Sequence, residues 1–169
     1  MSRDFRPVFR AIPARLRSDL PSGLRSFRWS ATSWMAKAWY GNKDLHYEVW
    51  VRYHAKVVEI GLHFEADALT NARLYGAFRA HANKIREALG EDARIEQWDK
   101  GWTRVWQPLP LEAIDDEYAD LIRTRFVDYV RALEPILREE LPNDVDWEPA
   151  KPPRRAAKVI SSRASRSGR

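Results

Sequence analysis

The sequence predicts an α+β fold: an antiparallel sheet in ββαββα-like order, with two long helices packed on one face. Two observations lead to this prediction. Residues 46–65 contain two runs in which apolar and polar side chains alternate, the pattern of a half-buried antiparallel strand pair. Residues 74–89 and 118–133 instead repeat apolar side chains every three to four positions, the pattern of amphipathic helices.

Length and composition fit one folded domain. The chain has 169 residues, of which 44% are hydrophobic and 12% aromatic, including 8 tryptophans. It has no cysteine, which excludes disulfides and thiolate chemistry. No apolar run approaches the ~20 residues that a membrane span needs. Acidic residues and prolines near the N-terminus argue against a targeting segment, so we expect a cytoplasmic protein.

Charge is sorted by position along the chain. Residues 1–40 carry a net charge of +6, residues 41–149 a net charge of −8, and residues 150–169 a net charge of +7. This pattern predicts an acidic folded body between two basic arms. We expect a basic, partly irregular lead over residues 1–32, a single α+β domain over residues 33–149 and a disordered basic tail over residues 150–169.

The first forty residues give two element predictions. A short helix is expected from Pro13, a favoured first-turn residue, to the break at residues 21–23. Residues 34–40 fit a third strand that places Lys37 opposite Glu48. The side chains that this strand would turn to the core are Trp34, Ala36, Ala38 and Tyr40. A helix through residues 30–40 is the alternative, because alanine and methionine favour one.

The first hairpin has one apolar and one polar face. Its apolar face consists of Tyr47, Val49, Val51 and Tyr53, with Val58, Ile60, Leu62 and Phe64 from the second strand. Pairing Tyr53 with Val58 keeps both apolar faces together, whereas a shift by one residue would not. The pairs on the polar face are then Arg52 with Glu59, Trp50 with Gly61, Glu48 with His63, and His46 with Glu65.

A helix follows the hairpin, between Asp67 as N-cap and Gly90 at the C-terminal end. A second hairpin is then expected over residues 93–106. Its turn is closed by Gly101 in the left-handed conformation. Pairing Glu96 with Arg104 puts three tryptophans on one face, and the sequence leaves open whether that face is buried; they are Trp98, Trp102 and Trp106.

The last predicted element is a helix that begins near Asp115, in a run of acids favoured at the positive helix end. Pro135 is expected to kink this helix or to start a new short one.

Four short segments resemble a known domain: His46-Tyr47-Glu48-Val49, residues 58–65, Ala88-Leu89-Gly90 at a helix end, and Trp102-Thr103-Arg104-Val105. Over about residues 45–137 the chain is similar to a small uncharacterised bacterial domain that is sometimes attached to restriction-type nuclease regions. The resemblance implies a bacterial, cytoplasmic setting and an accessory role near nucleic acid. It implies no reaction.

One cluster of residues offers metal-binding chemistry: His46, Glu48, His63 and Glu65 share the polar face of the first hairpin. Two imidazoles and two carboxylates can ligate zinc or iron, or act as an acid–base pair. The sequence favours a simpler interpretation, in which they are solvated pairs on an outer sheet face. No residue that would orient the imidazoles is visible. We therefore predict no cofactor, with a divalent metal as the alternative.

Other residues are candidates for binding. Trp50 stands among charged residues and is a candidate stacking ring for an exposed base, with Arg52 beside it as a cation. Four basic residues of the tail are candidate phosphate contacts, which would be independent of sequence and sensitive to salt: Lys151, Arg154, Arg155 and Lys158.

These features predict a non-enzymatic accessory module that binds nucleic acid or a nucleic-acid enzyme, with basic arms on the phosphates. No catalytic residue is assigned, because no nucleophile, phosphate-loop or paired-ligand motif occurs. Two alternatives remain open. One is a protein-interaction domain that uses the acidic body, with an acidic or basic protein as partner. The other is a small metal-dependent hydrolase built on the His/Glu cluster.

Overall fold

A computed structural model describes residues 3–151 of the chain. In this range the chain forms one antiparallel sheet of six strands, in the order β1-β2-β3-β4-β6-β5. The strands are β1 (Arg28–Ala31), β2 (Met35–Trp39), β3 (Leu45–Arg52), β4 (Val57–Phe64), β5 (Arg94–Gln97) and β6 (Thr103–Pro110). The α-helices are α1 (Arg6–Asp19), α2 (Ala68–Ala80), α3 (Ala82–Leu89) and α4 (Asp116–Glu140). The predicted α+β class is confirmed.

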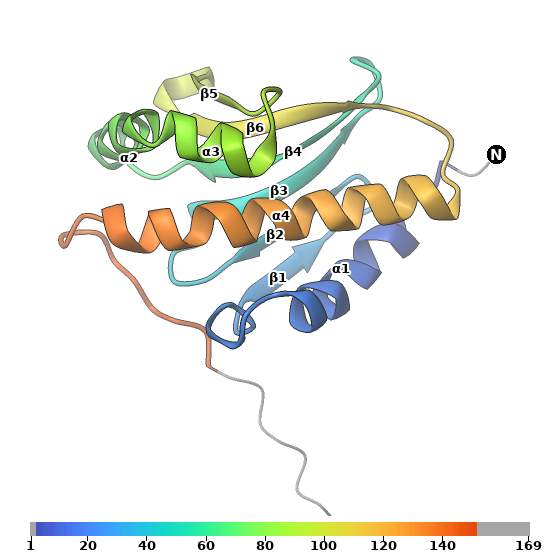
Figure 1. Ribbon diagram of the computed structural model, residues 1–169, viewed down its shortest axis with the longest axis horizontal. Coiled ribbons are helices and arrows are strands. Elements are labelled where there is room, and N and C mark those ends of the chain that lie inside the picture. The colour runs from blue at the N-terminus through green and yellow to red at the C-terminus, as the bar shows by residue number, and fades with distance from the viewer. Residues whose placement is uncertain (1–2, 152–169) are drawn as a thin grey trace, which may run out of the picture.

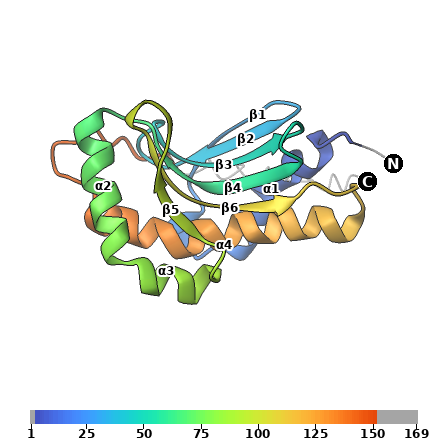
Figure 2. The same ribbon diagram turned by 90° about the horizontal axis from the view of Figure 1, so that it is seen from above.

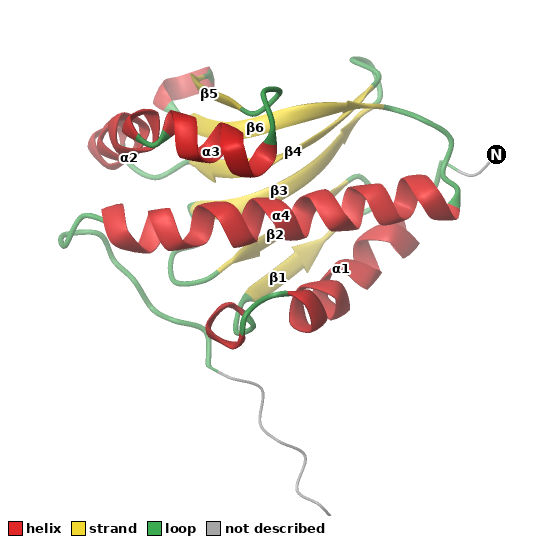
Figure 3. Ribbon diagram, viewed as in Figure 1, coloured by secondary structure: helices red, strands yellow, loops and turns green. Residues whose placement is uncertain are grey.

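The four α-helices of the described region lie on one side of the sheet (Figures 1 and 3). The view from above shows the sheet as one layer and the helices as a second layer beneath it (Figure 2). α4 runs across the centre of the sheet and contacts α1, α2 and α3 as well as β3 and β4. The described region therefore has four α-helices, where the sequence predicted two long helices and a short one from Pro13.

The core lies between these two layers. Alternate residues of the strands point into it, among them Val49, Ile60, Leu62, Phe64 and Val105. The apolar stripe of α4 meets them with Ile122, Phe126, Val130 and Leu133. Burying each such side chain contributes about 1.5–3 kcal/mol. The helices and this core cover one face of the sheet and leave the opposite face for the candidate site described below.

The N-terminal segment belongs to this core, so the prediction that residues 1–32 form a lead outside the domain is wrong. α1 begins at Arg6 and not at Pro13, with Pro7 in its first turn, where the missing N–H is not needed. Its apolar side chains recur every three to four residues and are buried against the core: Phe5, Val8, Phe9, Ile12, Leu16 and Leu20. α1 contacts α4 and β1, so the domain starts before residue 33.

The sequence left open whether residues 34–40 form a strand or part of a helix, and the structure has the strand β2 there. Lys37 lies opposite Glu48, as predicted. Ala36, Ala38 and Tyr40 are buried. Trp34 is not in the core: it is 44% exposed at the turn between β1 and β2.

The β3–β4 hairpin keeps the predicted faces but not the predicted register. Val51 pairs with Val58, and His46 pairs with His63, two residues away from the expected pairing. The turn occupies residues 53–56 and closes with Lys56 at φ 54°, in the left-handed region. Because side chains alternate, a two-residue shift leaves every residue on its face and changes only its partner.

The second hairpin has the predicted register: Glu96 pairs with Arg104, and Gly101 is left-handed with φ 77°. The predicted helix from Asp67 to Gly90 is divided at His81 into α2 and α3. Asp67 caps α2 by accepting a hydrogen bond from the Thr70 backbone N–H. α4 instead continues through Pro135 as one helix.

The described residues end at residue 151, so the predicted disordered tail lies outside them from residue 152 onward. The candidate phosphate contacts Arg154, Arg155 and Lys158 therefore lie outside them too. Lys151 is described and exposed. None of the helices between residues 3 and 151 combines the length and the apolar character that crossing a bilayer requires.

Candidate functional site

The sheet face opposite the helices carries the candidate site. In the part of the chain that the structure describes, no α-helix lies on this face (Figure 2). Charged and aromatic side chains occupy it: Lys37 from β2, His46, Glu48, Trp50 and Arg52 from β3, Glu59 and His63 from β4, Arg104 and Trp106 from β6, and Glu96 from β5. Several of them are buried by their neighbours, Glu48, Glu59 and His63 to 97% or more. The prediction that the His/Glu cluster forms solvated pairs on an outer sheet face is therefore wrong.

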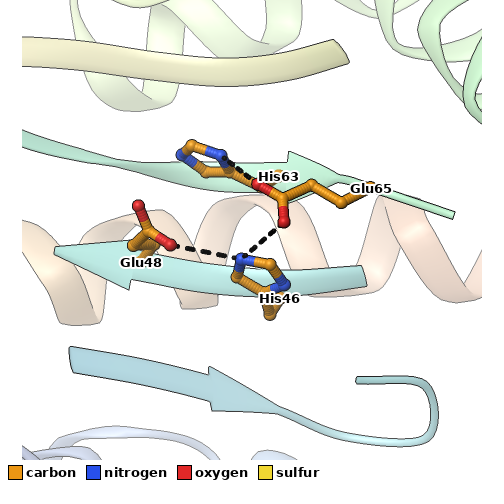
Figure 4. Close-up of side chains that lie close together, drawn as sticks. All are labelled: His46, Glu48, His63 and Glu65. Carbon is orange, nitrogen blue, oxygen red and sulfur yellow. Dashed lines mark ion pairs between the residues drawn. The ribbon is translucent and has the colours of Figure 1, made fainter. Parts of the chain in front are cut away.

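The four candidate metal ligands converge on this face (Figure 4). His46 and Glu48 are alternate residues of β3, His63 lies directly opposite His46 on β4, and Glu65 follows the end of β4. Nε2 of His46 is 3.3 Å from Oε2 of Glu48, and Nδ1 of His63 is 3.4 Å from Oε1 of Glu65. One ligand atom from each residue lies within 4.8 Å of the others.

The backbone orients one of the two imidazoles. Nδ1 of His46 lies 2.9 Å from the carbonyl oxygen of Lys43. A carbonyl oxygen only accepts hydrogen bonds, so Nδ1 carries the proton, and in the neutral ring the lone pair is on Nε2, which faces Glu48. Nothing in the sequence indicates this contact, because it depends on the turn that precedes β3.

Both carboxylates of the cluster are ionised at neutral pH. Burial raises the pKa of Glu48, but the adjacent imidazoles of His46 and His63 and the ammonium of Lys37 outweigh it and lower the pKa to about 2. Burial also raises the pKa of Glu65, and there the adjacent imidazoles of His63 and His46 and the ammonium of Lys37 lower the pKa overall. The cluster therefore presents two negative charges.

A second network lies beside the first. Glu59 accepts hydrogen bonds of 2.8 Å from both Arg52 and Arg104, and Arg104 also bonds Glu96. The guanidinium of Arg104 lies 4.5 Å from the ring centre of Trp98 and 3.8 Å from that of Trp106. Glu59 and Arg104 are buried, so their contact is not a surface ion pair. Removing one partner of a buried pair typically costs about 3–5 kcal/mol.

The face is closely packed at Gly61, which lies between Glu48 on β3 and Trp106 on β6. A Cβ atom on Gly61 would come within 2.6 Å of the Val105 carbonyl oxygen and of Trp106 Cβ. We expect Gly61→Ala to lower the free energy of unfolding by about 1–3 kcal/mol, because backbone cannot move aside as a flexible side chain would. Urea denaturation checks this, with Gly76→Ala on α2 as the control, where a Cβ meets nothing within 4 Å.

One pocket lined by the described residues has a volume of about 790 Å³. It lies where the tips of two hairpins meet the start of α1. Its walls are Ser33 and Trp34 from the β1–β2 turn, residues 50–55 from the tip of the β3–β4 hairpin, and Arg3, Asp4 and Arg6. The N-terminal segment that folds into the domain thus completes the pocket.

Aromatic rings and arginines line this pocket together. The ring centres of Trp34 and Trp50 are 6.4 Å apart, and Arg52 lies 4.9 Å from the centre of the Trp50 ring. Arg6 pairs with Asp4 at 2.8 Å, whereas Arg3 makes no ion pair with any described residue. A smaller pocket that shares Arg6 and adds Arg10 extends the basic lining along α1. The pocket is both cationic and aromatic.

The structure therefore divides the predicted site residues into two places. Trp50 and Arg52 line the pocket, whereas His46, Glu48, His63 and Glu65 lie toward the other end of the hairpin and are not part of its walls. Trp34, Arg3 and Arg6 were missed. The spacing of Phe5, Phe9, Ile12, Leu16 and Leu20 is the signal that would have brought the arginines to the domain.

The chain matches no protein-family model, no curated protein and no solved structure. Fold and surface alone define its class. It is an α+β protein in which a helix-covered core supports a sheet face with a buried His/Glu cluster and a cationic, aromatic pocket at the hairpin tips.

Proposed function

We propose that the protein is a non-enzymatic module that binds single-stranded nucleic acid, with the pocket at the hairpin tips as the binding site. The observation that carries this proposal is the exposed Trp34 ring beside Trp50 and Arg52, in a pocket edged by further arginines. Unpaired bases stack on such rings, and the phosphates between them need nearby cations.

The size of the pocket supports a ligand of this kind. Its volume of about 790 Å³ falls within the ~300–1,000 Å³ range of small-ligand sites. It is partly open to solvent, as a site for an extended strand must be. Trp34 is 44% exposed, so a base can reach its face without a rearrangement of the core.

The distribution of charge also supports nucleic-acid binding at the pocket. Residues 41–149 carry a net charge of −8 and would repel phosphate. Residues 1–40 carry a net charge of +6, and most of this segment is part of the domain. Arg3, Arg6 and Arg10 lie at or beside the pocket. Positive charge is thus concentrated where the tryptophans are.

The resemblance to a nuclease-associated bacterial domain agrees with this proposal, and the cytoplasmic, bacterial setting is part of it. Lys151 and the other basic residues of the tail would add phosphate contacts that do not depend on sequence. In this proposal the tail raises affinity, while the pocket distinguishes unpaired from paired bases.

Fluorescence anisotropy with a labelled oligothymidylate tests the proposal. We expect Trp34→Ala to weaken binding about 5- to 150-fold, since one base stack on an aromatic ring contributes about 1–3 kcal/mol. Trp102→Ala is the matched control, because Trp102 is also partly exposed on a hairpin but does not line the pocket. Equal affinity of the Trp34→Ala variant and the wild type would contradict the proposal.

The arginines are tested in the same assay at a series of salt concentrations. Replacing Arg3 and Arg6 by alanine should lower affinity at low salt and flatten the dependence of log K on log salt, because fewer counterions are released. Arg86→Ala, an exposed arginine on α3, should leave both unchanged.

A further inference from the structure

We propose that His46, Glu48, His63 and Glu65 form a binding site for a divalent metal ion, and that the ion is zinc. This inference is independent of the proposed nucleic-acid binding. Two imidazole nitrogens and two carboxylate oxygens are the mixed N/O donors that zinc accepts in proteins. The four side chains are held on adjacent strands of one rigid sheet.

Two buried nitrogen atoms support the proposal most directly. Nε2 of His46 and Nδ1 of His63 are buried and make no hydrogen bond with any described residue, although their residues are only 2% and 1% exposed. Leaving a buried polar atom without a partner is unfavourable, and native proteins rarely do so. Both nitrogens face carboxylates of the cluster (Figure 4). A bound cation would provide the missing partner for both.

The distances fit a tetrahedral site. Zinc lies ~2.0–2.1 Å from nitrogen and oxygen ligands, so the ligand atoms of a tetrahedron are ~3.3–3.4 Å apart. The His46–Glu48 and His63–Glu65 contacts measure 3.3 and 3.4 Å, and His46 Nε2 lies 4.0 Å from Glu65 Oε2. The last two distances end on different oxygens of Glu65, and one ligand atom from each residue lies within 4.8 Å of the others. Side-chain rotations that shorten the longer separations would bring four ligand atoms around one ion.

The surroundings are also those of a metal site. The Lys43 carbonyl holds the Nδ1–H of His46 and thereby aims Nε2 at the cluster, a backbone contact that metal-binding histidines commonly make. The His46 and His63 rings stack at 10° with centres 5.6 Å apart, and the Trp98 ring packs edge-on against His63. The rings fix the imidazoles and keep water away.

Lys37 is the competing cation. Its ammonium lies 3.0 Å from Oε2 of Glu48, the same oxygen that faces His46. The Lys37 side chain is 27% exposed and that of Glu48 only 4%, so the lysine can turn to solvent when an ion takes its place. Metal binding should therefore be tighter when this lysine is removed.

The burial of the four ligands indicates that the ion stabilises the fold. The side chains of His46, Glu48 and His63 are at most 4% exposed, and only Glu65, at 19%, reaches the surface. With four protein ligands a tetrahedral zinc has no open position for a substrate. We infer a structural ion that joins the start of β3 to the end of β4, in place of the hydrolytic centre considered from the sequence.

The test is titration of the metal-free, full-length protein with Zn²⁺, followed by calorimetry and metal analysis. We expect one equivalent of zinc per chain and a melting temperature about 5–10 °C higher at a zinc concentration of about one hundred times the Kd. Co²⁺ should give the visible absorption of a tetrahedral site. A folded wild type that takes up neither ion stoichiometrically would overturn the proposal.

Variants locate the ion. His63→Ala and the partly exposed Glu65→Gln should each lose the stoichiometric site, whereas His54→Ala, in the exposed β3–β4 turn, should keep it. Lys37→Met should bind zinc more tightly than the wild type. Wild-type zinc binding by a folded Glu65→Gln variant, together with no gain in Lys37→Met, would place the ion elsewhere and contradict the assignment.

Discussion

Phe9→Ala is expected to lower the free energy of unfolding by about 3–5 kcal/mol, a large part of the stability of a domain of this size. Phe9 is fully buried on α1 and stacks on Phe5, with ring centres 5.9 Å apart. Removing its ring leaves a cavity between α1 and the rest of the core, which neighbouring side chains cannot fill completely. The effect follows from the finding that the basic N-terminal segment is part of the domain.

Urea denaturation monitored by circular dichroism measures this loss. Arg10→Ala, one residue further along α1, is the matched control, since Arg10 is exposed and should change stability by no more than about 0.5 kcal/mol. A Phe9→Ala variant as stable as the Arg10→Ala variant would show that α1 does not contribute to the core, and the pocket that it helps to form would then lose its support.

The second large effect is a pH dependence that originates at Glu134. This residue of α4 is fully buried, accepts hydrogen bonds from Tyr47 and Arg138, and has its pKa raised to about 7 by burial, which those two contacts only partly offset. A raised carboxyl pKa means that the folded state holds the proton more tightly than the unfolded state does. Its contribution to stability is therefore present below about pH 4.5 and is lost as the pH rises through 7.

The expected loss is about 3 kcal/mol between pH 4.5 and pH 8, from a shift of the pKa from 4.5 to about 7. Glu134→Gln, which keeps the shape and cannot ionise, should be more stable than the wild type at pH 8 and lack this part of the pH dependence. Urea denaturation of both proteins across this range gives the difference directly. Glu139→Gln, at an exposed position of the same helix, is the control.

A difference between Glu134→Gln and the wild type that does not change with pH would contradict the assignment. Because both proteins carry the same histidines, the titration of those groups cancels in the comparison. Only the buried carboxyl distinguishes the two curves.

Local pattern was sufficient to predict two of the strand pairings. The pairing of Lys37 with Glu48 and of Glu96 with Arg104 followed from alternation and, in the second hairpin, from a turn that needs Gly101. The β3–β4 register could not be obtained in the same way, since a shift of two residues preserves both faces. There the turn decides, and it places the non-glycine residue Lys56 in the left-handed region, which nothing in the sequence signals.

The N-terminal helix shows a different difficulty. Its arginines and its two prolines suggested an irregular lead, and they concealed a regular apolar spacing from Phe5 to Leu20. Both prolines are tolerated in α1, Pro7 because it lies in the first turn. Charged side chains mark the solvent-exposed face of an element, and an amphipathic helix carries many of them on its outer face. A basic segment can therefore still be part of the folded domain.

The candidate site was predicted in composition but not in environment. Alternation alone placed His46, Glu48, His63 and Glu65 on one face. Their burial could not be foreseen, because what covers that face is other side chains of the same sheet, including the tryptophans of the second hairpin. The pocket depends on three segments that are distant in sequence, so only Trp50 and Arg52 were recognisable beforehand.

The most direct test of the central proposal is ultraviolet crosslinking of the full-length protein to an oligothymidylate, followed by peptide mapping. If the pocket at the hairpin tips holds the strand, the crosslinked peptides will contain Trp34, Trp50 or Tyr53. Crosslinks confined to residues 150–169 or to the second hairpin, with none at the pocket, would contradict it.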